Sequence, residues 1–237
     1  MSASIYDTAW MSMVSKKIDG ETTWLFPSSF QYIYDTQDEE GGWQNGDEID
    51  SILNTLACLL SFLKHRKLKT DDDELDDKID SATQFLTTKL AGWDISTTDR
   101  IGIEITIPNM LDMLELEGIH FAFPELNQMR EANKARMKQI DLSLMYKFSS
   151  SILYSLESFI GVIDFDKLSQ YLRNGSMMGS PSSTAAYLMN ASTWDESAEQ
   201  YLRDAIENGK RIADGVVTNV FPLSTFEFAW VIFRNRK

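Results

Sequence analysis

The acidic residues 72–76 have side chains of a type and spacing that could do chemistry. The segment reads Asp-Asp-Glu-Leu-Asp, so on a helix its carboxylates at spacings of three and four share one face. Carboxylates in this arrangement can hold Mg²⁺, which can bridge to a diphosphate. The flanking Lys67, Lys69 and Lys78 make the stretch highly polar, however, whereas a working site places its acids at the mouth of an apolar cavity. We therefore predict a solvated loop and helix start over residues 67–80.

Nucleophilic and metal-binding side chains are scarce in the rest of the chain, which has two histidines and one cysteine. His65 ends an apolar segment, where a cationic helix cap is expected. His120 falls in a predicted loop or helix edge, and Cys58 lies in an apolar run typical of a small buried residue. This separation argues against a zinc site and against a Cys/His nucleophile. The sequence also has no Gly-rich phosphate loop and no Gly-x-Ser-x-Gly motif.

The charge of the chain restricts its partners. A net charge of −14 argues against binding to nucleic acid, which requires a basic face. An anionic ligand would need a local basic patch or Mg²⁺. No run approaches the roughly 20 apolar residues that span a bilayer, and residues 1–10 lack the regions of a signal peptide. With a single cysteine, these features predict a soluble, cytoplasmic protein without a transmembrane segment.

The elements that position any site are predicted to be helices. Apolar residues recur at spacings of three and four, the helical period, in residues 52–63, 107–116, 142–159 and 198–206. Residues 102–107 alternate like a strand, but we interpret them as a helix start, because a long helical pattern follows and Pro108 suits a first helical turn. Strand patterns joined by tight hairpins are scarce. The predicted fold class is therefore all-α.

Two features of the sequence recur. A glycine turn at residues 37–43 has a weaker echo at residues 174–176, and a helix-like segment follows each. The first turn is expected to tie helices together and to do no chemistry. Phe-Pro also precedes a predicted helix three times, at Phe26-Pro27, Phe123-Pro124 and Phe221-Pro222. Such repetition, without a strict repeat, predicts an α/α-barrel-like domain of paired helices with polar loops at its ends.

Seven segments, in order along nearly the whole chain, resemble motifs of the class II diterpene cyclases of the copalyl diphosphate synthase type. The closest resemblance is to the fungal bifunctional enzymes. Glu40 and Gly42 stand where the family pattern has Asp and Ser. The matching segments are residues 4–10 (SIYDTAW), 26–43 (FP followed by QDEEGGW), 49–60 (IDSILNTLACLL), 101–108 (IGIEITIP), 153–157 (LYSLE), 180–185 (SPSSTA) and 218–222 (TNVFP).

This resemblance implies an active site between two helical domains, named β and γ, with γ inserted after the first helix of β. Residues 1–17 would be that first β helix, 18–214 the γ domain and 215–237 the return into β. The implied reaction cyclises geranylgeranyl diphosphate to a bicyclic copalyl-type diphosphate after protonation of its terminal alkene. The general acid, an Asp-x-Asp-Asp motif, is expected in the β domain beyond Lys237, so the chain by itself is expected to be inactive.

The resemblance also implies which residues remove the final proton. In plant relatives, a histidine of the LHS segment and an asparagine of the PNV segment hold the water that acts as base, and other members have a Tyr/His pair. Here the positions carry Tyr154 and Asn219, a mixed pair. The alternatives are that Tyr154 is an aromatic in a helical core and that Asn219 is a helix cap.

Charged residues complete the implied site. Arg136 and Lys138 fall near the position of basic residues that help hold the diphosphate, although a solvated face is an alternative for each. The acidic, Mg²⁺-associated segment before residues 101–108 is reduced here to Asp94 and Asp99. Mg²⁺ is thus the cofactor expected for the whole enzyme.

Three interpretations follow. In the first, the chain supplies half of the cyclisation chamber, its partner is the remaining β domain, and the surface where that domain docks leads to self-association. In the second, the chain is a non-catalytic helical interaction module derived from a terpene cyclase. In the third, it is an α-barrel subunit like those of protein prenyltransferases, although it lacks their zinc ligands.

Overall fold

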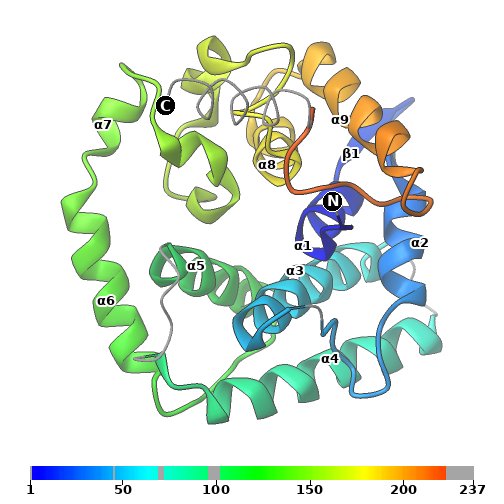
Figure 1. Ribbon diagram of the computed structural model, residues 1–237, viewed down its shortest axis with the longest axis vertical. Helices are drawn as coiled ribbons and strands as arrows, with labels where there is room; N and C mark the ends of the chain where they lie inside the picture. Colours follow the sequence, from blue (N-terminus) through cyan, green and yellow to red (C-terminus); the bar gives the residue numbers. More distant parts are fainter. Residues whose placement is uncertain (1, 45, 69–71, 96–101, 223–237) are drawn as a thin grey trace, which may run out of the picture.

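The computed structural model describes residues 2–44, 46–68, 72–95 and 102–222, and the helices there confirm the all-α class (Figure 1). Short 3₁₀ segments and one small hairpin accompany the α-helices. The α-helices are α1 (Ile5–Ser12), α2 (Pro27–Asp35), α3 (Glu48–Arg66), α4 (Asp73–Gly92), α5 (Ile103–Leu116), α6 (Leu126–Gln139), α7 (Leu142–Met145), α8 (Pro181–Asn190) and α9 (Glu196–Gly209). The other elements are β1 (Ser15–Ile18), β2 (Glu21–Trp24), η2 (Ser151–Tyr154), η3 (Leu156–Phe159) and η4 (Phe165–Tyr171).

The helices form two layers, as Figure 1 shows. Helices α1, α3, α5 and α8 lie inside, and α2, α4, α6 and α9 surround them. Each inner helix packs against an outer one: α1 against α2, α3 against α4, α5 against α6, and α8 against α9. The inner helices also contact one another, through α1 with α3 and α8 and through α3 with α5. The predicted α/α-barrel-like arrangement of paired helices is thus confirmed.

Apolar side chains of the inner helices fill the centre. Trp10, Ile52, Leu56 and Leu59 are almost completely buried and belong to one continuous core, which also holds the buried Cys58. Side-chain caps begin several of the helices, because a serine or aspartate accepts a hydrogen bond from a backbone N–H of the first turn. These caps are Ser4, Asp47, Asp72, Ser180 and Asp195. Within the described ranges, no helix is long and apolar enough to cross a membrane.

The glycine turn at residues 37–43 joins three helices. Gln37 donates from Nε2 to the Lys78 carbonyl of α4 at 2.9 Å. The Trp43 indole donates to the Ile33 carbonyl of α2 at 3.0 Å, and its backbone N–H donates to Thr55 Oγ1 of α3 at 3.3 Å. The expected structural role of this turn is therefore confirmed.

The acidic residues 72–76 form a helix start, as predicted. Asp72 caps α4 by accepting the Leu75 N–H, and Asp76 pairs with Arg66 of α3. His65 differs from its prediction as a cationic cap. It is buried, stacks between Trp24 and Phe30 with ring centroids 3.9 and 3.8 Å away, and places Nε2 2.8 Å from the Ser12 carbonyl oxygen. Tertiary packing decides its environment, whereas His120 is exposed in a loop as expected.

The predicted helix over residues 142–159 is wrong beyond α7. Residues 151–159 form the 3₁₀ segments η2 and η3, broken between Tyr154 and Leu156. A residue far along the chain satisfies the backbone there: Ser183 Oγ donates to the Leu153 carbonyl at 2.6 Å and accepts the Leu156 N–H at 3.1 Å. Side chains that bond backbone groups in this way offer an alternative to the helical ladder.

Smaller differences concern turns and prolines. A hairpin turn joins β1 to β2 through Asp19 and Gly20, both at positive φ, and was not predicted. Pro27 begins α2 as expected, but Pro108 lies inside α5 rather than in its first turn. The helix predicted after Pro222 falls outside the described residues. The helix start predicted at residues 102–107 is confirmed by α5.

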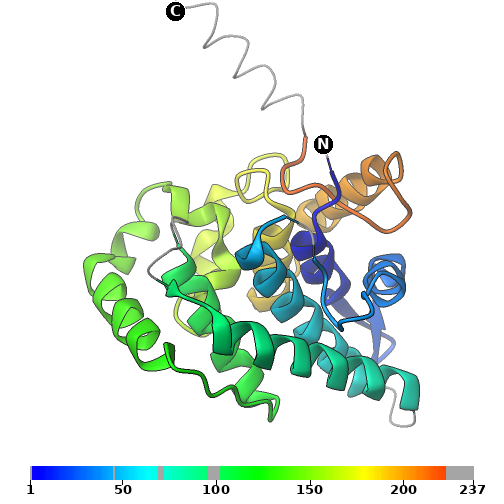
Figure 2. The ribbon, with the colours of Figure 1, turned by 60° about the horizontal axis from the view of Figure 1, so that its bottom comes forward.

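The two ends of the described chain lie together (Figures 1 and 2). Ser4 N–H donates to the Val217 carbonyl at 2.9 Å, and Val217 N–H donates to Thr8 Oγ1 at 3.2 Å. The segments assigned by resemblance to the β domain, residues 1–17 and 215–237, are thus adjacent where they are described. The division at residues 17 and 214 itself stays a prediction.

We predict that Gly41→Ala destabilises the protein more than Gly20→Ala. Both glycines have positive φ, +89° and +87°. A Cβ at Gly41 would meet the Ser81 carbonyl of α4, whereas nothing lies within 4 Å of one at Gly20. Left-handed strain alone costs about 1–2 kcal/mol, and the steric overlap should raise the loss at Gly41 to about 3 kcal/mol or more. Urea unfolding of both variants measures this, and equal losses would contradict the role assigned to the turn.

Candidate functional site

Tyr154 and Asn219 lie side by side although they are 65 residues apart in the sequence. The Tyr154 hydroxyl donates to the Asn219 backbone carbonyl at 2.9 Å. Leu153, which is 1% exposed, anchors η2 in the core, and the Ser183 hydroxyl fixes its backbone. The structure therefore brings together the two residues that the resemblance implies for proton removal.

Tyr154 is a neutral phenol at ordinary pH. Burial, together with the nearby charges of Asp7 and Glu157, raises its pKa to about 12. Because its O–H is donated to the Asn219 carbonyl, the phenol oxygen faces other groups as a hydrogen-bond acceptor. Tyr154 can thus hold a water molecule through that oxygen without ionising.

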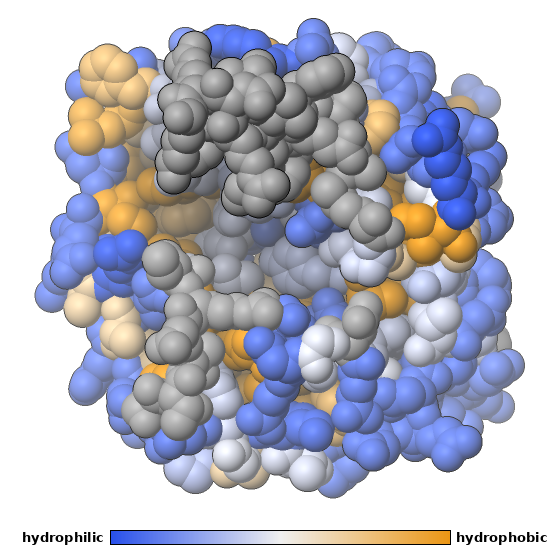
Figure 3. All heavy atoms as spheres, viewed as in Figure 1, coloured by the Kyte–Doolittle hydropathy of each residue, from blue (hydrophilic) through white to orange (hydrophobic). Residues whose placement is uncertain are grey.

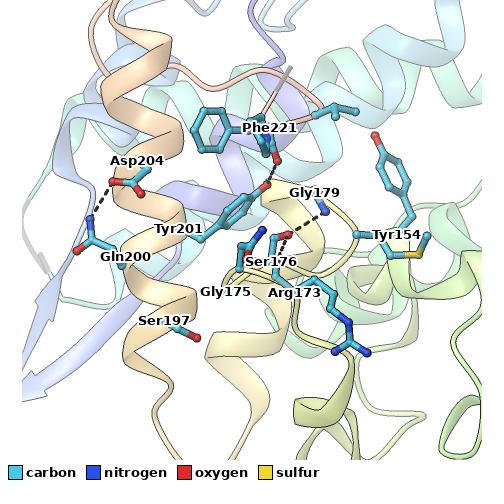
Figure 4. A pocket seen from close by; sticks show the side chains of 14 residues that line it. Tyr154, Arg173, Gly175, Ser176, Gly179, Ser197, Gln200, Tyr201, Asp204 and Phe221 are labelled. Atoms are coloured by element: carbon cyan, nitrogen blue, oxygen red, sulfur yellow. Dashed lines mark hydrogen bonds between the residues drawn. The ribbon is translucent and has the colours of Figure 1, made fainter. Parts of the chain in front are cut away.

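Two cavities meet at Tyr154. The apolar cavity, of about 1000 Å³, lies between Tyr154 and Tyr201 (Figure 4). There Tyr201 donates to the Phe221 carbonyl at 3.0 Å. In Figure 4, Tyr154 stands across the cavity from Tyr201, and Arg173 points away from both rings. The other lining residues are Asn174, Gly175, Ser176, Met178, Gly179, Ser197, Gln200, Asp204, Val220 and Pro222.

The acidic cavity, of about 950 Å³, lies on the other side of Tyr154 and is also lined by Asn219. Its walls carry the carboxyl groups of Asp7, Asp50 and Glu157, and the described residues that line it include no lysine, arginine or histidine. Figure 3 shows hydrophobic side chains around the hollowed middle of the face seen in Figure 1, with a mostly hydrophilic rim. The remaining lining residues are Ser2, Ala3, Ser4, Ile5, Tyr6, Gly46, Leu53, Asn54, Gly102, Ile103, Thr106, Ser155, Ser180, Ser182 and Val220.

Two buried acids, Asp7 and Glu157, form a part of the site that the sequence did not reveal. They are 5% and 4% exposed. Asp7 accepts hydrogen bonds from the Ser4 hydroxyl at 2.5 Å and from the Ser182 N–H at 3.0 Å. Glu157 Oε1 accepts longer ones from Tyr6 Oη at 3.3 Å and from the Ser182 hydroxyl at 3.4 Å.

Burial raises the pKa of both acids. For Glu157 the rise, to about 8, comes from burial and from the charge of Asp7. The pKa of Asp7 is also raised by burial, against the effect of its bonds from Ser4 and Ser182. The only signal in the sequence was that both acids lie within segments of the family resemblance, residues 4–10 and 153–157.

The charged residues predicted to bind diphosphate and metal lie elsewhere. Arg136 and Lys138 are exposed in the last turn of α6, where Arg136 pairs with Glu104 at 3.3 Å, and neither lines the apolar or the acidic cavity. Asp94 is exposed after α4, and Asp99 lies outside the described residues. In the part of the chain that the structure describes, no three His, Cys, Asp or Glu residues gather as a metal site. Diphosphate and Mg²⁺ binding by these residues stays a prediction.

Solved structures identify the class of protein. Abietadiene synthase from Abies grandis matches with a TM-score of 0.80 and 27% identity, over 97% of this chain and 29% of that one. The ent-copalyl diphosphate synthase from Arabidopsis thaliana matches with a TM-score of 0.80 and 28% identity, over 98% of this chain and 33% of that one. The chain therefore has the fold of the helical part of class II diterpene cyclases, whereas no family model matches it.

Proteins of similar sequence identify the family within this class. The chain is 42% identical to phyllocladan-16-alpha-ol synthase from Phomopsis amygdali over 241 residues, which is 98% of the chain and 24% of that protein. It is 42% identical to copalyl diphosphate synthase from Talaromyces verruculosus over 237 residues, which is 97% of the chain and 25% of that protein. The chain belongs to the family of the fungal bifunctional diterpene synthases, and it spans about a quarter of the length of these relatives.

We predict that the stability of the Glu157→Gln variant, relative to wild type, increases as the pH rises. The folded-state pKa, about 8, lies above the ordinary value of 4.5, so the stabilising effect of protonated Glu157 is complete below pH 4.5 and is lost as the pH rises toward 8. The glutamine amide of the variant does not ionise, so the variant does not lose this stability as the pH rises. The difference in unfolding free energy between variant and wild type should therefore shift by about 2–4 kcal/mol in favour of the variant between pH 4.5 and 8.5.

Urea unfolding at the two pH values measures the shift. Glu199→Gln is the matched control, because bonds from Arg203, Trp194 and Lys16 outweigh burial and hold the pKa of Glu199 below its usual value. That variant should instead lose stability relative to wild type as the pH rises. A shift of the same sign in both variants would contradict the assignment of Glu157 as a protonated acid.

Proposed function

We propose that this chain forms one wall of the cyclisation chamber of a class II diterpene cyclase, which converts geranylgeranyl diphosphate to a copalyl-type diphosphate. The contact of Tyr154 with Asn219 at the junction of two cavities carries this proposal. The names of the relatives support it: one is a copalyl diphosphate synthase, and the Arabidopsis structure contains (S)-15-aza-14,15-dihydrogeranylgeranyl thiolodiphosphate.

The first step, protonation of an alkene, needs a strong acid. Glu157, with a pKa of about 8, is too weak to protonate an alkene, and Asp7 also has a raised pKa. We propose that the acid is an Asp-x-Asp-Asp motif of the β domain, as the family resemblance implies. The part proposed for this chain is the enclosure of the carbocation and the removal of its final proton.

The final step needs only a weak base, because a C–H bond beside a carbocation is strongly acidic. We propose that a water molecule held by Tyr154 and Asn219 takes this proton. The C–H bond breaks, its electron pair forms the alkene, and the proton passes to the water. Phe221, Val220 and Met178 supply apolar and aromatic walls, which exclude other water and stabilise positive charge.

The diphosphate is proposed to bind on another part of the chain. Among the described residues, the lining of the acidic cavity has the carboxyl groups of Asp7, Asp50 and Glu157 and no basic side chain, which disfavours a diphosphate there. Arg136 and Lys138 remain the proposed diphosphate contacts, with Asp94 and Asp99 as proposed Mg²⁺ ligands of the whole enzyme. Carboxylates of this kind suit Mg²⁺, which binds through one or two acids and substrate phosphates.

We predict that Tyr154→Phe and Asn219→Ala each lower the formation of copalyl-type product. The experiment grafts this chain onto the Talaromyces verruculosus copalyl diphosphate synthase in place of the matching quarter, and supplies geranylgeranyl diphosphate. Loss of a group that holds the base should cost about tenfold to a hundredfold in rate and change the product mixture. Gas chromatography of the dephosphorylated products measures both effects.

Tyr201→Phe is the matched control, because it removes another hydroxyl that donates to a carbonyl of the same segment and keeps the ring. Its rate should stay within about threefold of the unmutated graft, because only one part-buried hydrogen bond is lost. Equal effects at Tyr154 and Tyr201 would assign both hydroxyls to the fold alone. A graft without cyclase activity would favour the non-catalytic interaction module.

We also predict that the isolated chain self-associates through exposed apolar side chains. Phe148, Val162, Met178 and Leu144 are 47–65% exposed, which suits a surface that another domain covers. Sedimentation velocity should show dimers or larger species, and a hydrophobic dye should bind. Monomers that bind no dye would contradict this prediction.

A further inference from the structure

Met178 has a left-handed backbone, with a φ of 51°, and it lines the apolar cavity. The described residues include two others that have positive φ and are not glycine, Asp19 and Asn174. Aspartate and asparagine tolerate this conformation because their short polar side chains bond the local backbone, and methionine has no such compensation. Backbone strain of this kind is uncommon, and it gathers at functional sites where the surrounding structure fixes it.

The neighbours of Met178 fix its backbone. Met177 is 0% exposed, and its N–H donates to Thr184 Oγ1 of α8 at 3.0 Å. On the other side of Met178, the Gly179 carbonyl accepts the Phe221 N–H at 2.8 Å. The strained conformation is therefore imposed by contacts with α8 and with the segment that follows Asn219.

The side chain of Met178 has few contacts of its own. It is 49% exposed, whereas the side chain of Met177 belongs to the core. Glycine would adopt the same backbone without strain, so packing within the described chain does not explain a methionine at this position. The apolar cavity does, because a side chain that lines it takes up volume between Tyr154 and Tyr201 (Figure 4), whereas glycine takes up none.

The bulk of this side chain matches one unit of a prenyl chain. A methionine side chain is unbranched and apolar, and it has roughly the bulk of one isoprene unit. An apolar pocket discriminates by size, by about tenfold or more for a methylene that does not fit. One methionine in the cavity can thus separate two prenyl chains that differ by one isoprene unit.

We propose that Met178 is a specificity-determining residue, which limits the length of the prenyl diphosphate that the chamber accepts. This inference rests on the proposed function. Met178 occupies the space that geranylfarnesyl diphosphate, one isoprene unit longer than geranylgeranyl diphosphate, needs for its additional unit. Its flexible side chain still adapts to the shorter substrate. The strain at this position is retained because the side chain closes that space.

Three variants of Met178 in the grafted enzyme test this role. Met178→Ala and Met178→Gly remove the side chain, and Met178→Leu keeps its volume. The measured quantity is kcat/KM for geranylfarnesyl diphosphate divided by kcat/KM for geranylgeranyl diphosphate. We expect this ratio to rise about tenfold in Met178→Ala and Met178→Gly, and to stay within about twofold of the unmutated graft in Met178→Leu.

The ratio does not depend on how much of the enzyme is folded, so a purely structural role does not change it. Asp19→Ala is the matched control, because it removes a side chain at another left-handed position that lines neither cavity. Its ratio should stay within about twofold of the unmutated graft. Unchanged ratios in Met178→Ala and Met178→Gly, or an equal rise in Met178→Leu or Asp19→Ala, would overturn the proposal.

A measurement on the 237-residue protein does not depend on activity. At a left-handed position glycine is more stable than alanine, and at negative φ the order is reversed. Met178→Gly should therefore unfold at a higher urea concentration than Met178→Ala, and the reverse order would overturn the proposal. An unmutated graft without copalyl-type product would refute the proposed function, on which the role of Met178 rests. An active graft with unchanged ratios would refute the role of Met178 alone.

Discussion

The site depends on the contact between Asp7 and the start of α8. Asp7 accepts the Ser182 N–H, one of the backbone donors that a helix leaves without a partner at its N-terminus. This bond fixes α1 against α8, while Ser183 in the same turn fixes η2 and η3 through the backbone of Leu153 and Leu156. The position of Tyr154 therefore depends on α8, which begins at Pro181, 27 residues later in the chain.

The same contact explains why the site holds a carboxyl group in its neutral form. Asp7 accepts the Ser182 N–H at the start of α8 and the Ser4 hydroxyl, whereas Glu157 Oε1 accepts two longer bonds and lies near the charge of Asp7. Burying one carboxylate is expensive, and burying two without a cation is more so. Retaining a proton on Glu157 reduces that cost. An acidic cavity thus coexists with a chamber wall suited to a carbocation.

Much of the fold could be predicted from the sequence, because α3 and α9 have both helical periodicity and side-chain caps. The segment 142–159 could not, since Ser183, far along the chain, satisfies its backbone. Tyr154 and Asn219 were found through family resemblance, and their contact is visible only in the fold. Glu157 was missed because its burial results from the packing of α5 and α8 around η3, which no local pattern records.

The central claim is that Tyr154 and Asn219 face the reacting hydrocarbon. A crystal structure of the grafted cyclase with the aza-geranylgeranyl analogue named for the Arabidopsis structure tests it most directly. We expect the hydrocarbon of the analogue to fill the apolar cavity, with its chain in van der Waals contact, about 4 Å, with the Tyr154 ring. An analogue bound elsewhere, with the cavity beside Tyr154 and Asn219 filled by solvent, would contradict the account.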